Sequence, residues 1–251
     1  MNNTKKISYI SGWIKNYADN MAKPAQSLVV GISGGIDSAL TSTLSSLTGI
    51  KTIAISMPIT TNQNPCNLGS IHGKWLMDKF TNASYINIDL TDSYKIFHSK
   101  LSDMEQLSDL GFANSKARLR MMTLYQVASS QNGIVVGTGN KVEDFGVGFY
   151  TKYGDGGVDI SPIADLMKSE VKDLSKTLEI DSRIIDAEPT DGLWDDDRTD
   201  EKQLGLSYDD LEEAMINLKS MNRKKYEIIR NNNMHKMNPI PVCKFPKDNL
   251  E

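Results

Sequence analysis

The sequence has few cysteines, no long apolar run and no block of basic residues. Its two cysteines, Cys66 and Cys243, stand far apart and outside any Cys-x-x-Cys pattern, which favours reduced thiols. No apolar run approaches the roughly 18 residues that span a bilayer, and the N-terminus lacks the apolar core of a signal peptide. We therefore expect a cytoplasmic protein that has no membrane partner.

The charges of the chain are nearly balanced. There are 28 Lys and Arg against 32 Asp and Glu, a formal net charge of −4, so nothing indicates a nucleic-acid surface. The 251 residues are enough to bury a sizeable core, and no internal repeat or linker divides them. We expect one domain over residues 1–251, with flexible loops near 150–160 and 188–205.

Strand patterns alternate with helical patterns through the first half of the chain. The predicted strands are 28–32, 51–57, 85–90 and 133–137. The predicted helices are 4–20, 67–80, 91–104, 113–131, 168–178, 207–219 and 221–233. This alternation predicts an α/β fold, a doubly wound and mostly parallel sheet flanked by helices. Ligands of such sheets bind beyond the carboxyl ends of the strands.

The most informative segment follows the first predicted strand. Ser33-Gly34-Gly35-Ile36-Asp37-Ser38 is a glycine turn that leads into a helical pattern. Unpaired backbone N–H groups and the helix dipole make such a turn an anion site, which Gly34 and Gly35 leave open to a phosphate. Asp37 would repel a bare phosphate, so it predicts a bridging divalent cation. The alternative is a serine-rich helix N-cap with no ligand.

The loop lacks the lysine of a Walker A sequence. It resembles the S-G-G-x-D-S loop of the ATP pyrophosphatases, a superfamily with a Rossmann-like sheet that cleaves ATP between the α and β phosphates. After the fourth predicted strand, Thr138 is a candidate nucleotide contact. Glu143 is a candidate second carboxylate beside Asp37, and two carboxylates plus phosphate oxygens suit Mg²⁺.

Further motifs narrow the resemblance. Phe149-Tyr-Thr-Lys-Tyr-Gly-Asp-Gly-Gly-Val-Asp159 is similar to the F-[FY]-T-K-Y-G-D-G-G-x-D segment of NAD synthetases. The other matches keep the order of that family: Ala117-Arg-Leu-Arg-Met121, Ser161-Pro162, Lys168, Pro189-Thr190-Asp191, Leu204-Gly-Leu-Ser-Tyr-Asp209 and His235-Lys236. Together they cover nearly the whole chain.

The resemblance implies an ammonia-dependent NAD synthetase. Such an enzyme uses ATP and ammonia to amidate deamido-NAD (nicotinic acid adenine dinucleotide), through an adenylated carboxylate, to NAD, AMP and pyrophosphate. It also implies Mg²⁺ as cofactor and a homodimer with the dinucleotide site at the subunit interface. Ammonium has to lose a proton before it attacks, and Asp155 or Asp159 is a candidate base.

The resemblance also implies a role for individual residues. The ATP-binding set is Gly31, Ile32, Ser33, Gly34, Gly35, Ile36, Asp37, Ser38, Thr138, Lys168 and Thr190. The deamido-NAD set is Arg118, Lys152, Asp159, His235 and Lys236. Asp37 and Glu143 are the expected metal ligands, and the expected catalytic residues are Asp37, Lys168 and Thr190.

The chain departs from the family pattern in two places. One extra residue separates Glu143 from Lys152, so counting back from Lys152 makes Asp144 the metal ligand, whereas counting from Gly137 makes it Glu143. We favour Glu143, because a bulge after it is easier to accommodate than a shift of the strand-end loop. The segment after Pro58 differs too, which leaves the adenine contacts open.

Other enzymes with this loop remain as alternatives. An amination like that of GMP synthetase uses similar chemistry, but such enzymes carry a glutaminase domain, for which the 32 residues before the loop are too few. A synthetase subunit supplied with ammonia by a separate glutaminase is also open. A tRNA-thiolating enzyme would need reactive cysteines and a basic face. An ATP-sensing module would need neither the two carboxylates nor the dinucleotide residues.

Overall fold

The computed structural model describes residues 1–59, 68–105, 107–194, 196 and 198–245. Within them, one parallel sheet has the strand order β3-β2-β1-β4. The strands are β1 (Ser27–Gly31), β2 (Lys51–Ser56), β3 (Ala83–Asn87) and β4 (Gly133–Val135). The order reverses between β1 and β4, and ligands of doubly wound sheets bind at such a switch point.

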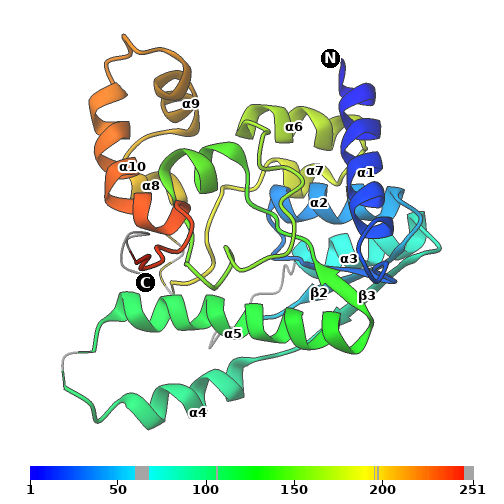
Figure 1. Cartoon of the computed structure of the whole chain (residues 1–251), viewed down its shortest axis with the longest axis horizontal. Helices are drawn as coiled ribbons and strands as arrows, with labels where there is room; N and C mark the ends of the chain where they lie inside the picture. The colour runs from blue at the N-terminus through cyan, green and yellow to red at the C-terminus, as the bar shows by residue number, and fades with distance from the viewer. Residues whose placement is uncertain (60–67, 106, 195, 197, 246–251) are drawn as a thin grey trace.

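Helices lie on both faces of the sheet (Figure 1). The helices of the first half are α1 (Asn3–Asp19), α2 (Ile36–Leu47), α3 (Leu68–Lys79), α4 (Thr91–Leu101) and α5 (Asp109–Ser130). Those of the second half are the π-helix η1 (Lys141–Val147), α6 (Lys168–Thr177), α7 (Ser182–Ile185), α8 (Asp200–Leu204), α9 (Tyr208–Ile216) and α10 (Arg223–Met237). The predicted α/β fold, a doubly wound parallel sheet, is confirmed.

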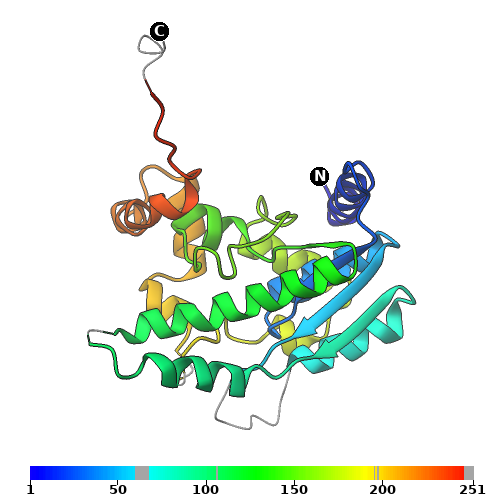
Figure 2. The ribbon, with the colours of Figure 1, turned by 60° about the horizontal axis from the view of Figure 1, so that its bottom comes forward.

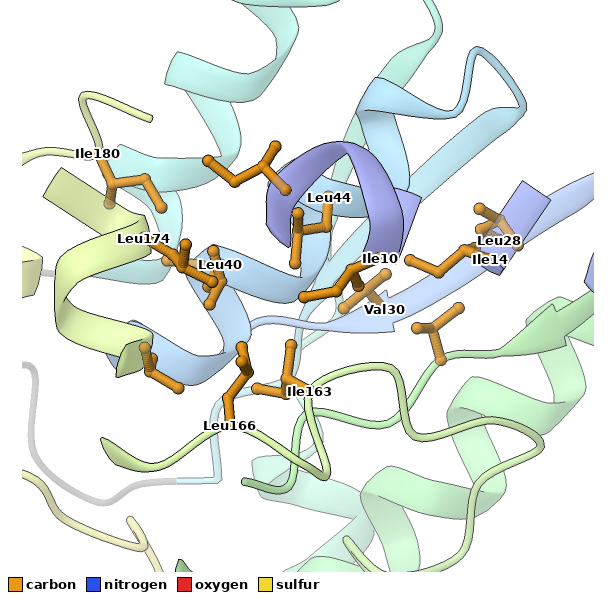
Figure 3. Close-up of a cluster of buried hydrophobic side chains, with 14 of the residues drawn as sticks. Ile10, Ile14, Leu28, Val30, Leu40, Leu44, Ile163, Leu166, Leu174 and Ile180 are labelled. Atoms are coloured by element: carbon orange, nitrogen blue, oxygen red, sulfur yellow. The ribbon is translucent and has the colours of Figure 1, made fainter. Parts of the chain in front are cut away.

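The side chains of β1 alternate between two cores, as a strand requires. Leu28 and Val30 join the larger cluster of buried residues, to which α1, α2 and α6 contribute (Figure 3). Val29 joins a second cluster on the opposite face, together with residues of β2 and α5. The sheet is therefore covered on both faces, and the glycine loop that follows β1 begins between these two cores.

A third cluster lies beside the sheet. It joins η1, α9 and α10, and its buried members include Val142, Leu211 and Tyr226. Figure 1 shows α8, α9 and α10 gathered next to η1. The cluster formed by η1, α9 and α10 thus places side chains from the second half of the chain at the edge of the sheet. That residues 1–251 form one domain remains a prediction.

Two of the predicted loops carry more structure than expected. Residues 150–160 form successive turns and end in a bridge between Ile160 and Val136. The predicted loop 188–205 contains α8, which Thr199 caps by accepting from the backbone N–H of Lys202. The predicted flexibility of both segments remains a prediction.

No helix in the described ranges has the length and apolarity needed to cross a membrane. Cys243 is a free, exposed thiol, and Cys66 lies outside the described residues. Residues 238–245, which follow α10, run away from the body of the molecule (Figure 2).

Candidate active site

The glycine loop joins the end of β1 to the start of α2. Gly34 has a φ of +97°, and a Cβ there would lie 2.9 Å from the backbone nitrogen of Gly69. Ser33 Oγ accepts a 3.1 Å hydrogen bond from the N–H of Gly35, and Ser38 Oγ donates to the Gly35 carbonyl at 2.8 Å. Only glycine suits position 34, and the hydroxyls hold the turn at the helix N-terminus, where an anion is favoured.

Three charged side chains meet at this end of α2. Lys168 Nζ lies 2.6 Å from Asp37 Oδ2 and 2.8 Å from Glu143 Oε1. Their side chains are only 12–16% exposed. The three residues come from α2, η1 and α6, so the fold brings together what the sequence separates. Both carboxylates converge on one cation.

Asn140 fixes this arrangement and was not predicted. Its Oδ1 accepts from the N–H groups of Val142 and Glu143, at 2.9 and 3.0 Å, and thereby caps η1. Its Nδ2 donates to Asp37 Oδ1 at 3.1 Å, and the residue is fully buried. An asparagine before a helical segment is a recognisable N-cap signal. No pattern in the sequence indicates the hydrogen bond from Asn140 to Asp37.

The extra residue between Glu143 and Lys152 lies in a segment that begins with a π-helix. The wider turn of a π-helix accommodates one additional residue within a helical segment. Glu143, and not its neighbour Asp144, shares Lys168 with Asp37. The carboxylate of Asp144 lies against Gly139, where a Cβ would be 1.8 Å from Asp144 Oδ2. This geometry supports the register that makes Glu143 the metal ligand, which remains a prediction.

The three charges alter one another's protonation. Burial lowers the pKa of Lys168, but Asp37 and Glu143 outweigh burial and raise it, so the ammonium is retained. Burial raises the pKa of Glu143, but Lys168 and a hydrogen bond from Tyr208 bring it below its usual value. Burial, reinforced by the charge of Glu143, raises the pKa of Asp37. Two carboxylates against one ammonium leave the centre suited to further positive charge.

These residues fit Mg²⁺. The oxygens of Asp37 and Glu143 already converge on one cationic nitrogen, at 2.6 and 2.8 Å. The described residues contain no group of three or more His, Cys, Asp or Glu side chains placed to hold a metal. Mg²⁺ does not need such a group, because it is commonly bound by one or two carboxylates and by substrate phosphates.

Tyr208 completes the centre and was not predicted. Its hydroxyl donates to Glu143 Oε1 at 2.6 Å and lies 3.3 Å from Asp200 Oδ2. Its ring face lies 4.7 Å from Lys168 Nζ. Burial and the two carboxylates raise the pKa of Tyr208, which keeps its hydroxyl a donor. The motif from Leu204 to Asp209 contains this tyrosine, but no feature of the motif indicates that its hydroxyl contacts Glu143.

A second group brings together four of the five predicted dinucleotide residues. The Arg118 guanidinium donates to the Lys152 carbonyl at 3.4 Å. Lys152 Nζ donates to the His235 carbonyl at 3.3 Å. Lys236 Nζ donates to the Tyr150 carbonyl at 2.8 Å. These bonds tie α5 and α10 to the segment 150–153 and collect positive charge beside η1.

Asp159 makes different contacts. Its Oδ2 accepts from the N–H of Val135 at 2.7 Å, and its Oδ1 accepts from the hydroxyl of Tyr125 at 3.0 Å. The Asp159 carboxylate thus links the end of β4 to α5. Its role toward a dinucleotide remains a prediction.

The two predicted threonines lie on different segments. Thr138 follows β4, at the edge of the sheet where the glycine loop also lies. Thr190 is exposed, two residues before Gly192, whose carbonyl accepts from Arg120 Nη2 at 3.5 Å. Lys116 Nζ holds the next residue, Leu193, through its carbonyl at 3.0 Å. The roles of both threonines remain predictions.

Comparison with known proteins agrees with this geometry. The family model described as NAD synthase matches residues 6–249. The NH(3)-dependent NAD(+) synthetase of Methanosarcina acetivorans is 37% identical over 94% of this chain and 97% of its own. That of Mycoplasmopsis pulmonis is 39% identical over 82% of this chain and 76% of its own.

Two solved structures share the fold. The NMN synthetase of Francisella tularensis superposes with a TM-score of 0.85 and 30% identity, covering 98% of this chain and all of its own. The NH3-dependent NAD synthetase of Campylobacter jejuni gives a TM-score of 0.76 and 23% identity, covering 97% of this chain and 100% of its own. The chain therefore belongs to the NAD synthase family of ligases, whose members serve NAD biosynthesis by amidation.

Proposed function

We propose that the protein amidates the carboxylate of deamido-NAD with ammonia and ATP, and forms NAD, AMP and pyrophosphate through an acyl-adenylate. The observation that carries the proposal is the convergence of Asp37, Glu143 and Lys168 at the mouth of the glycine loop. The triphosphate and the acceptor carboxylate bring negative charge to one place, and a metal ion there needs anionic ligands. This centre supplies both carboxylate ligands and an ammonium there.

The first step needs positioning more than covalent chemistry from the protein. An oxygen of the nicotinate carboxylate attacks the α-phosphorus of ATP, and the bond from that phosphorus to the bridging oxygen breaks, so pyrophosphate leaves. Lys168 stabilises the charge that develops on the phosphoryl oxygens. The turn from Ser33 to Ser38 receives the pyrophosphate through its backbone N–H groups.

Mg²⁺, held by Asp37 and Glu143, would neutralise phosphate charge during the adenylation step. In the second step ammonia adds to the acyl carbon, and AMP leaves as the C–N bond forms. Water would hydrolyse the acyl-adenylate, so a cover over the site is useful. The segment 188–205, which carries the predicted ATP contact Thr190, is the proposed cover.

The positive group beside η1 is the proposed site of the dinucleotide. Arg118, Lys152 and Lys236 lie within one set of hydrogen bonds, and they suit the pyrophosphate bridge of deamido-NAD. Burial lowers the pKa of Lys236 against the opposing charges of Asp155 and Asp144, so Lys236 lies near the residue that follows Glu143. An acceptor held there reaches toward the cation centre. Asp155, in the same segment, is a candidate to take the proton of ammonium.

A shorter acceptor is the second candidate. The Francisella tularensis protein is an NMN synthetase, and its identity and TM-score to this chain exceed those of the Campylobacter jejuni NAD synthetase. Nicotinic acid mononucleotide lacks the AMP half of deamido-NAD and carries the same carboxylate. The same adenylation and amidation would convert it to NMN. The relatives at 37 and 39% identity, which are NAD synthetases, favour the dinucleotide.

The two acceptors are separated by a direct comparison. Purified protein receives ATP, Mg²⁺ and ammonium with either deamido-NAD or nicotinic acid mononucleotide, and AMP and the amide product are measured. The proposal expects kcat/KM to be at least about tenfold higher for deamido-NAD, a difference of about 1.4 kcal/mol in transition-state binding. Equal or reversed values favour the mononucleotide. Glutamine in place of ammonium tests the nitrogen source.

A homodimer is part of the proposal. Helix α4 buries none of its residues, although it carries Ile96 and Phe97, which are 64 and 43% exposed. Leu110 and Met122 of α5 are 59 and 60% exposed. Figure 1 shows these two helices along one edge of the molecule. Exposed apolar side chains on two neighbouring helices suit contact with a second copy of the chain.

A further inference from the structure

Tyr208 contacts Glu143, Asp200 and Lys168 without being charged itself. Its hydroxyl carries one hydrogen and has two acceptors, Glu143 Oε1 at 2.6 Å and Asp200 Oδ2 at 3.3 Å. The shorter contact identifies Glu143 as the acceptor of that hydrogen. The face of the same ring lies 4.7 Å from Lys168 Nζ. One side chain therefore restrains two of the three members of the cation centre.

The position of Tyr208 is itself fixed. It is only 7% exposed, and it packs with Leu211 and Val142 in the cluster formed by η1, α9 and α10. Ser207, just before it, caps α9 in a capping box with Asp210. The ring is thus held by the core and by the helix start, so its hydroxyl and its face have little freedom. A rigid group of this kind can orient a carboxylate.

Tyr208 also links the centre to the proposed cover. Its backbone N–H donates to Glu201 Oε1 at 2.9 Å, and its hydroxyl lies beside Asp200. Both acidic residues belong to α8, and the N–H of Asp200 donates to the carbonyl of Pro189 at 3.0 Å. The start and end of the segment 188–205 are thereby joined to the residue that holds Glu143.

We propose that Tyr208 is a positioning residue for the cation centre: its hydroxyl aims the Glu143 carboxylate at the point shared with Asp37, and its ring keeps Lys168 at that point. The inference rests on the proposed use of ATP and a divalent cation, but not on the identity of the acceptor. A carboxylate that is already aimed loses less freedom when it binds a cation, so loss of the hydroxyl weakens cation-dependent binding of ATP.

The test is equilibrium binding of ATP at increasing Mn²⁺, without acceptor or ammonium, so that no turnover occurs. Tyr208→Phe keeps the ring and removes one oxygen. We expect the Mn²⁺ concentration for half-maximal ATP binding to rise about tenfold, the factor for one hydrogen bond to a charged group. Wild-type dependence on Mn²⁺ in Tyr208→Phe would overturn the inference.

Tyr226→Phe is the matched control. Tyr226 is 5% exposed, lies in the same cluster, and donates its hydroxyl to the Gly146 carbonyl at 3.3 Å, away from the charged centre. Tyr226→Phe should change the melting temperature about as much as Tyr208→Phe. It should leave the Mn²⁺ concentration for half-maximal ATP binding within about twofold of wild type. An equal shift in both variants would reduce Tyr208 to a structural role and overturn the inference.

A double-mutant cycle separates positioning from general loosening of the fold. Once Glu143→Gln has removed the carboxylate, adding Tyr208→Phe should change the Mn²⁺ dependence by less than about twofold. Multiplicative effects of the two changes would contradict the inference. Binding of ATP with Mn²⁺ that persists while deamido-NAD is not amidated would mean that the proposed acceptor is wrong and the role of Tyr208 stands. Wild-type protein that binds no ATP with Mn²⁺ would overturn both.

Discussion

The ammonium of Lys168 lies 2.6 Å from the carboxylate of Asp37, although 131 residues separate the two in the sequence. Asp37 stands in the first turn of α2, and Lys168 begins α6. Helix packing in the larger core holds the two helix starts together, since Leu40 of α2 and Leu174 of α6 belong to the same cluster (Figure 3). The core thereby fixes the centre that the proposed reaction uses.

Removal of either carboxylate from this centre should abolish most of the activity. Asp37→Asn and Glu143→Gln keep the size of the side chain and remove its charge, so we expect kcat to fall at least about 100-fold in each. Asp144→Asn is the register control and should cost much less. Steady-state NAD formation at saturating Mg²⁺ checks this. An active Glu143→Gln beside an inactive Asp144→Asn would place the metal on Asp144.

Substitution of Gly34 should damage the phosphate loop. In Gly34→Ala the new Cβ would lie 2.9 Å from the Gly69 nitrogen at a φ of +97°. Gly49→Ala is the matched control, with a φ of +78° and nothing within 4 Å. Both variants should lose about 1 kcal/mol of unfolding free energy from backbone strain, and Gly34→Ala should lose more because its Cβ meets the Gly69 backbone. Only Gly34→Ala should also weaken ATP binding, by about tenfold or more. Isothermal titration calorimetry with ATP measures this affinity, and equal affinity in the two variants would contradict a close-fitting loop.

His72 should make the protein acid-sensitive. It is 1% exposed, contacts Ser42 Oγ through Nε2 at 2.9 Å, and burial lowers its pKa from 6.5 to about 4. The unfolded chain takes up a proton below pH 6.5, whereas the folded chain does so only near pH 4. Stability is therefore complete above pH 6.5 and falls as the pH drops toward 4, by about 3 kcal/mol.

Urea unfolding at both ends of that pH window checks the role of His72. His72→Gln should be less stable than wild type at neutral pH, because it loses the ring stacked on Trp75 at 5.3 Å. It should also lose less stability on acidification. His98→Gln changes an exposed histidine and should keep the wild-type dependence on pH. An unchanged pH dependence in His72→Gln would exclude His72 as the source.

The proposed homodimer predicts that charge on α4 separates the copies. Phe97→Asp introduces a carboxylate into the apolar face, and a buried unpaired charge is costly. Met77→Asp on α3 is the matched control, since Met77 is also 43% exposed. Sedimentation velocity should give a dimer for wild type and Met77→Asp, and a monomer for Phe97→Asp. A monomeric wild-type protein would contradict the proposal.

The sheet and its helices could be predicted because hydrophobic periodicity and glycine turns are local signals. The third strand was placed too late, at 85–90. Ile88 and Leu90 continue its apolar alternation, but β3 ends at Asn87. Leu90 is already the N-cap residue of α4, and Asp89 Oδ1 accepts from the N–H of Thr91 at 2.8 Å. Apolar residues therefore extended the predicted strand into a helix cap.

The candidate site also contains some residues that could be predicted from the sequence and others that could not. Asp37, Glu143 and Lys168 stand in motifs with a recognisable order, and the fold brings them together, although their roles remain predictions. Asn140 and Tyr208 could not be predicted, because their contacts with Asp37 and Glu143 span 103 and 65 residues of sequence and arise only from packing. The π-helix around Glu143 had no sequence signal beyond the extra residue.

The most direct test of the account is amidation of deamido-NAD by the purified protein. With ATP, Mg²⁺ and ammonium, the account predicts NAD and AMP in equal amounts, with kcat/KM for deamido-NAD above that for nicotinic acid mononucleotide. Exclusive turnover of the mononucleotide, or of an unrelated acceptor such as xanthosine monophosphate, would contradict it.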